Sequence, residues 1–140
     1  MPQACWSASP RGEYWIDVNL GGRPLQVLID SGLIDARDQV GFSIASSLYD
    51  KIKQSGGFGN HQMHTRLTAD GQISHTESGS LDARLICPQP HSLIGPVVTT
   101  YVFRGAPGVP DRAGMAFFHL LKGCKVEWDL DQRLWCISYP

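Results

Sequence analysis

The residues best suited to chemistry are Asp30-Ser31-Gly32, which follow the apolar run Val27-Leu28-Ile29. Carboxylates hydrolyse a peptide bond in pairs: an ionised one takes a proton from water while a protonated one donates to the carbonyl oxygen. Two like charges about 3 Å apart cannot both ionise, so such a pair shares one proton. The aspartate must end a rigid strand, and the next residues must supply a hydroxyl and a sharp turn, which glycine permits. Asp30-Ser31-Gly32 has this form, although the same tripeptide also occurs in ordinary turns.

Two predicted strands position Asp30. Residues 13–20 alternate between apolar and polar side chains, which is the period of a half-buried strand. Gly21-Gly22 then predicts a tight turn. Residues 24–30 read as a second strand, and the unbroken apolar run in its last part is typical of a strand buried on both faces.

The remaining segments predict a mostly β chain with one or two short helices. Ser43 is predicted to cap an amphipathic helix that ends at Gly56-Gly57, and residues 115–122 predict a second helix. Asp70-Gly71 is typical of a type I′ hairpin turn, because both of its positions require positive φ. Further strands are predicted at residues 61–69, 72–87, 93–103, 124–128 and 133–139.

The composition is that of a single folded domain. The chain has 140 residues, and its 15 glycines and 9 prolines favour short strands joined by many turns. A net charge of −1 gives no reason to expect nucleic acid or an anionic membrane as a partner. No apolar stretch approaches the roughly 20 residues that span a bilayer, and residues 1–12 lack the features of a signal peptide. We therefore expect a cytoplasmic protein.

The cysteines and histidines predict neither a metal site nor a cofactor. No cysteine belongs to a C-x-x-C pair or has a histidine at zinc-ligand spacing. We expect reduced, buried thiols; on the arms of the last predicted hairpin, Cys124 and Cys136 are the pair that could face each other. His61 and His64 form H-x-x-H, but a strand puts these positions on opposite faces, so exposed histidines are expected. The other two cysteines are Cys5 and Cys87.

The segment Val27-Leu28-Ile29-Asp30-Ser31-Gly32 resembles the active-site turn of the retropepsin-like aspartic proteases (clan AA), and in particular of their bacterial single-domain members. Residues 68–72 are similar to the family's flap hairpin, which closes over substrate. Residues 114–129 are similar to its closing segment, in which a glycine precedes a short helix and a final hairpin. The resemblance extends over roughly residues 13–139.

This resemblance implies a single-domain retropepsin-like acid protease β-barrel over residues 13–140, with a flap hairpin, preceded by an N-terminal extension over residues 1–12. Asp30 would be the catalytic residue, with Ser31 and Gly32 supporting its turn. Gly114 would form the glycine turn of the second half. The flap residues that would cover substrate are Ala69, Asp70, Gly71 and Gln72.

A chain with one Asp-Ser-Gly supplies half of a carboxylate pair. A homodimer is therefore expected, with Asp30 of each subunit meeting across a two-fold axis. The apolar segment Leu134–Tyr139 is a candidate terminal strand for the interface, since an unpaired apolar strand otherwise invites aggregation. The implied function is an aspartic endopeptidase that acts on a peptide or protein substrate without a cofactor.

Two departures from the family's pattern leave other functions open. Arg112-Ala113 precedes Gly114 where the family usually has two bulky apolar residues, and Leu33 follows the Asp-Ser-Gly. An arginine beside the catalytic turn can distort it or hold a carboxylate in its charged form. The second hypothesis is therefore a catalytically weak or inactive retropepsin-like dimer that binds peptides or proteins. A third is a chain that stays monomeric until a partner assembles it.

Overall fold

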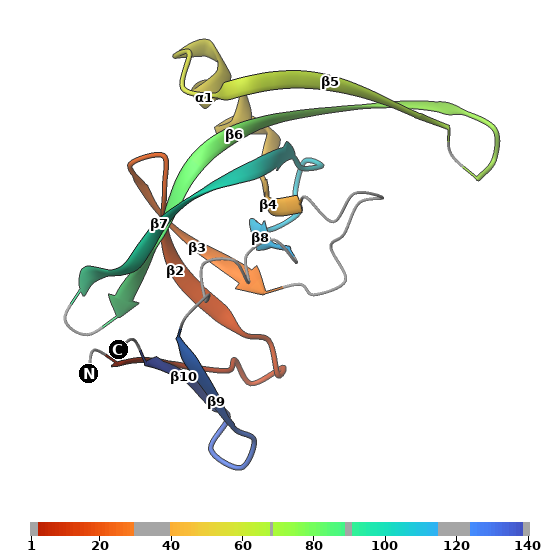
Figure 1. The fold of residues 1–140 in the computed structure, drawn as a ribbon. Coiled ribbons are helices and arrows are strands. Elements are labelled where there is room, and N and C mark those ends of the chain that lie inside the picture. The colour runs from red at the N-terminus through yellow and green to blue at the C-terminus, as the bar shows by residue number, and fades with distance from the viewer. Residues whose placement is uncertain (1–2, 30–39, 68, 89–90, 115–123, 139–140) are drawn as a thin grey trace.

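Strands dominate the computed structural model of this protein, which describes residues 3–29, 40–67, 69–88, 91–114 and 124–138 (Figure 1). The strands in these ranges are β1 (Gln3–Ser7), β2 (Trp15–Leu20), β3 (Arg23–Ile29), β4 (Val40–Ile44), β5 (Gly59–Leu67), β6 (Ile73–Pro88), β7 (His91–Arg104), β8 (Arg112–Ala113), β9 (Lys125–Asp129) and β10 (Leu134–Ser138). One helix, α1 (Ser46–Gln54), lies in the same part of the chain. The mostly β expectation is confirmed, and the helix predicted at residues 115–122 lies outside the described residues.

Seven strands form one sheet in the order β2-β3-β8-β4-β7-β6-β5, and β2 also pairs with β6. This extra pairing joins β2, β3, β8, β4, β7 and β6 into a closed ring of strand pairings. The alternation predicted for residues 13–20 is confirmed, because Ile16, Val18 and Leu20 on β2 are at most 1% exposed. Val27 on the neighbouring β3 is also fully buried. The strand that precedes Asp30 is therefore anchored in the core.

The two ends of the described chain meet in a second, three-stranded sheet with the order β1-β10-β9 (Figure 1). Trp6 on β1 is the register partner of Trp135 on β10, which in turn is the partner of Trp128 on β9. The stacked rings lie 4.7 Å and 5.3 Å apart between centroids. This row of aromatic rings covers the inner face of the terminal sheet, where Trp6 and Trp135 are buried.

The terminal sheet corrects one expectation. The predicted last strand is present as β10, but it is the central strand of the sheet and pairs with β1 on one side and β9 on the other. It is therefore not an unpaired edge. The strand at the edge beside β10 is β1, which lies within the predicted N-terminal extension. The division of the chain at residue 12 stays a prediction.

The cysteine expectation is wrong for one pair. Cys5 and Cys136 form a disulfide across the β1–β10 pairing, where they are register partners. Cys136 is the register partner of Glu127 on β9, and Cys87 and Cys124 take no part in this disulfide. Sequence spacing could not reveal this bridge, because its two halves are 131 residues apart. The cytoplasmic location stays a prediction.

The start of the predicted helix is also wrong. Ser43 and Ile44 belong to β4, Ala45 is the N-cap residue, and α1 begins at Ser46. Ser43 pairs with residues of β7 and β8 and is 6% exposed, so strand pairing overrides its preference for a helix cap. The predicted end of the helix is confirmed, because Gly56 follows the last turn with a φ of 71°.

Candidate active site

The described part of the site begins where β3 ends. β3 pairs in parallel with the two-residue strand β8, with Leu28 opposite Arg112 and Ile29 opposite Ala113. The Ile29 N–H also donates to the Tyr14 carbonyl oxygen at 2.8 Å. The last residue before Asp30 is therefore fixed from both sides by main-chain pairing. Asp30, Ser31 and Gly32 themselves lie outside the described residues.

In the sheet, β8 lies between the end of β3 and β4 and pairs with both. It runs parallel to β3 and antiparallel to β4, so that Ala113 is the partner of both Ile29 and Phe42. The next residue, Gly114, is buried, and its N–H donates to the Gly41 carbonyl oxygen at 2.8 Å. The predicted second-half glycine thus lies beside the strand that follows the Asp-Ser-Gly segment. Whether it forms part of a catalytic site stays a prediction.

Asp111 is a positioning residue that sequence reasoning missed. Its carboxylate Oδ1 accepts a hydrogen bond from the Ala45 N–H at 2.8 Å, and its main-chain carbonyl accepts one from the Leu28 N–H at 3.0 Å. It therefore links the end of β3 to the start of α1. An aspartate that satisfies a helix-start N–H is a common device, but here the acceptor lies 66 residues away in the chain, so no local motif reveals it.

Arg112 lies at the same junction. It is half-buried and is the register partner of Leu28 on β3 and of Ser43 on β4. An arginine at this position brings a positively charged residue to the end of β3. A family member with an apolar pair here would lack that charge.

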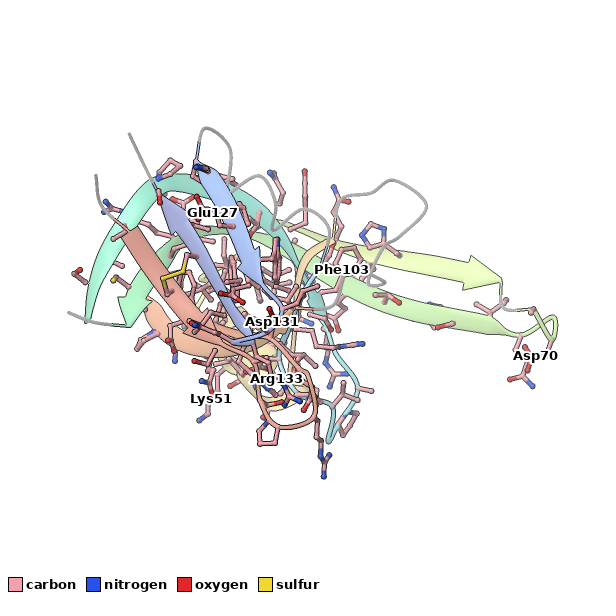
Figure 2. All side chains as sticks on the ribbon, turned by 90° about the horizontal axis from the view of Figure 1, so that it is seen from below. Lys51, Asp70, Phe103, Glu127, Asp131 and Arg133 are labelled. Atoms are coloured by element: carbon pink, nitrogen blue, oxygen red, sulfur yellow. A yellow bond between two sulfur atoms is a disulfide. The ribbon has the colours of Figure 1, made fainter. Side chains whose placement is uncertain are left out.

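The predicted flap is a long hairpin of β5 and β6 that extends away from the rest of the fold (Figure 1). Figure 2 shows Asp70 at its far tip. Ala69, Asp70, Gly71 and Gln72 are all exposed. The outer half of the hairpin also exposes apolar surface, with Met63 60% and Ile73 67% exposed. A substrate-covering role for this tip stays a prediction.

The turn of this hairpin differs from the expected type I′. Leu67 and Ile73 form the last pair, so five residues connect the strands instead of two. Gly71 adopts a φ of 82°, and the Asp70 carboxylate accepts the Gln72 N–H at 3.4 Å. A longer loop relaxes the requirement for positive φ at both central positions, which explains why the hairpin forms with a different turn.

The base of the hairpin is held by a small charge cluster on α1, β5 and β6. The Glu77 carboxylate lies 2.8 Å from Lys53 Nζ and 2.9 Å from His61 Nε2. These hydrogen bonds, first from Lys53 and then from His61, lower the pKa of Glu77 below its usual value. Charge pairing here ties α1 to the hairpin that carries the predicted flap.

The two histidines of the H-x-x-H motif contact β6. His61 is exposed and pairs with Glu77, whereas the half-buried His64 lies 2.8 Å from Ser78 Oγ and stacks on the Phe103 ring. Within the described ranges, no group of three or more histidine, cysteine or acidic side chains is arranged to hold a metal ion. The same part of the chain has no helix long and apolar enough to cross a membrane.

An open depression of about 600 Å³ lies at the opposite end of β3 from Asp30. It is bordered by the Gly21-Gly22 turn, the end of α1, and the facing segments of β6 and β7. Its walls mix charged and apolar side chains, including Arg23, Asp82 and Leu93. This depression does not contribute to the predicted catalytic site.

No protein-family model and no curated protein sequence matches the chain. In three dimensions the chain is similar to the crystal structure of a retropepsin-like aspartic protease from Rickettsia conorii, with a TM-score of 0.63. The two share 14% sequence identity, and the match covers 99% of this chain and 91% of the other. At this identity the similarity concerns the fold: a mostly β arrangement like that of a retropepsin-like protein.

Proposed function

We propose that the protein is an aspartic endopeptidase whose active site is completed by a second copy of the chain. The observation that carries the proposal is the coincidence of two independent features. The fold is like that of a retropepsin-like protein over almost the whole chain. The only Asp-Ser-Gly in the sequence directly follows β3, the strand that is fixed by β2 and β8.

In this proposal Asp30 and its counterpart in the partner subunit share one proton. The ionised carboxylate takes a proton from the attacking water, and the protonated one donates to the carbonyl oxygen of the scissile peptide. Ser31 and Gly32 hold the turn, and Gly114 supports it from the second half. The hairpin tip at residues 69–72 covers the substrate and excludes bulk water. No cofactor takes part.

The homodimer follows from the chain's supply of one such aspartate. A site with two aspartates requires two chains, and a two-fold axis brings identical groups together. The exposed apolar side chains on the hairpin, Met63 and Ile73, are consistent with a surface that meets substrate or a partner subunit.

The test is cleavage of a peptide library between pH 4 and 7 by the wild-type protein and by Asp30→Asn. The proposal expects cleavage that is lost in the variant, because the amide cannot act as the ionised base. Asp131→Asn, at an exposed position in the turn between β9 and β10, is the matched control and should keep full activity. Cleavage that persists in Asp30→Asn contradicts the proposal.

A second candidate function is peptide or protein binding without cleavage, and Arg112 is the observation that favours it. A positive charge near the end of β3 stabilises an ionised carboxylate and so opposes the shared-proton state. The comparison is Arg112→Leu, which restores an apolar side chain at this position. Peptide binding by the wild type without turnover, with turnover appearing in Arg112→Leu, supports the binding function. Efficient turnover by the wild type excludes it.

A further inference from the structure

The disulfide between Cys5 and Cys136 joins β1 to β10 in the terminal sheet (Figure 2). Side chains alternate along a strand, and the neighbours Trp6 and Trp135 point into the core. The sulfur atoms therefore lie on the opposite, solvent-facing side. Cys5 is exposed and Cys136 is half-buried. A dissolved reagent can consequently reach this bond without unfolding the domain.

The disulfide secures a strand that lies at an edge of the terminal sheet. β1 is the edge strand of the terminal sheet, and β10 is its one neighbour there. Besides its five register pairs with β10, β1 packs against β6 and β2 and buries the indole of Trp6; just after the strand, the Ala8 N–H donates to the Arg133 carbonyl oxygen at 2.7 Å. Edge strands open more readily than central strands. A covalent bond at this point thus adds a constraint that opposes the opening of this edge.

We propose that the Cys5–Cys136 disulfide is a thiol-reversible clasp that fixes β1 to the terminal sheet and so couples the stability of the fold to the thiol–disulfide state of the surroundings. The inference does not depend on peptidase activity. It assigns a regulatory role to two residues on the face of the sheet opposite the aromatic row, far along the chain from Asp30.

The reaction is thiol–disulfide exchange with a small thiol, and it balances as follows. A thiolate RS⁻ attacks one sulfur of the disulfide, forming a mixed disulfide and releasing the other cysteine as a thiolate, which takes up a proton. A second RS⁻ attacks the mixed disulfide, releasing RSSR and the second cysteine thiolate. Two thiols are oxidised to RSSR, and Cys5 and Cys136 gain two electrons and two protons.

The charges around the clasp predict which thiols react fastest. An open depression of about 620 Å³ borders Cys136. It is lined by Glu127, Asp129 and Asp131, of which Glu127 pairs with Lys125 at 2.8 Å. The residues that line the depression therefore carry a net negative charge. A cationic thiol such as cysteamine is favoured over an anionic thiol such as mercaptoacetate, and salt reduces the difference.

The decisive experiment uses the full chain in its oxidised form and after treatment with dithiothreitol. Alkylation after denaturation should count two free thiols before reduction and four after it. Reduction should lower the melting temperature and increase hydrogen exchange in residues 3–7. The variant Cys5→Ser/Cys136→Ser should match the reduced wild type with or without dithiothreitol. Cys124→Ser leaves the clasp intact and should keep the full response.

Two readouts need no variant, so the inference stays testable if the double variant fails to fold. The first is the wild type's own response to reduction, and the second is the rate ratio of cysteamine to mercaptoacetate, each divided by its rate on a small model disulfide. Four alkylatable thiols after mild oxidation with oxidised glutathione overturn the inference. So does a disulfide whose reduction changes neither the melting temperature nor exchange in β1. Loss of peptidase activity in Asp30→Asn has no bearing on either readout.

Discussion

Asp111 connects the two main-chain segments that flank the predicted catalytic turn. Its carboxylate satisfies the Ala45 N–H at the start of α1, and its carbonyl satisfies the Leu28 N–H near the end of β3. Both ends of the segment that contains Asp30 are thereby connected to the same residue. The sequence alone favoured Asp30 because of its flanking pattern, and Asp111 lacks such a pattern. Only the tertiary fold reveals its role.

Replacement of Asp111 by alanine should destabilise the fold by about 1.5–3 kcal/mol, the usual range for a lost hydrogen bond to a charged group. The free energy of unfolding in urea is the appropriate measurement. Asp111→Asn retains an acceptor oxygen and should cost less, and Asp131→Asn at its exposed position should cost almost nothing. Equal losses of unfolding free energy in all three variants would show that the hydrogen bond from the Ala45 N–H does not contribute measurably to stability.

Gly79 lies close to the Phe58 ring, so a larger side chain at this position probes how tightly the two are packed. A Cβ atom at this position would lie 2.6 Å from Phe58 Cγ, and the neighbouring ring of Tyr49 is itself buried. Gly79→Ala should therefore cost about 1–3 kcal/mol through overpacking. In a Phe58→Ala background the same change should cost much less, as measured by a double-mutant cycle. An unchanged cost in that background would point to the strand backbone as the cause.

For individual strands and helices, local sequence patterns predicted the features that depend on interactions between neighbouring residues. The alternation in residues 13–20 became β2 because one face of that strand is buried throughout. The pattern failed at Ser43, where pairing of β4 with β7 and β8 outweighs the preference of serine for a helix cap. It also failed for the turn after β5, whose length is set by the pairing of Leu67 with Ile73.

The charge cluster at the base of the hairpin predicts a pH dependence. Lys53 and His61 lower the pKa of Glu77 in the folded state, so the ionised carboxylate favours folding. That contribution is fully present above the ordinary value of 4.5 and is lost as the pH falls through the lowered pKa. Glu77→Gln should therefore be less stable than the wild type at pH 7, by about 0.2–1 kcal/mol for a pair so close to solvent.

The measurement is chemical denaturation from pH 7 down to pH 2. The gap between wild type and Glu77→Gln should close as the pH falls below 4.5. Glu127→Gln is the matched control, because the Glu127 side chain is 58% exposed against 18% for Glu77, and it should have a smaller effect at pH 7. A gap that stays constant with pH would mean that Glu77 acts through packing instead of charge.

At the scale of the whole molecule, the fold class was within reach of the sequence but the joining of its ends was not. A retropepsin-like architecture was indicated by the short strands, the many turns and the Asp-Ser-Gly behind a buried strand. The solved structure from Rickettsia conorii has a similar fold. The pairing of β1 with β10 depends on contacts between the two ends of the chain, which no local pattern reports. The Cys5–Cys136 bridge closes a loop with a sequence separation of 131 residues. In the chain-entropy model, a disulfide that closes a loop of this size raises the free energy of unfolding by about 5 kcal/mol.

If two copies of Asp30 form one active site, mixing wild-type and variant subunits reveals their dependence on each other. Wild type and Asp30→Asn are mixed in equal amounts, subunit exchange is verified by mass spectrometry, and the peptidase rate is compared with that of the wild type alone at the same total protein concentration. Because mixed dimers lack one carboxylate, random pairing should give a peptidase rate of about one quarter of the wild-type rate. A rate of about one half would contradict a shared active site, since each wild-type chain would then act independently of its partner.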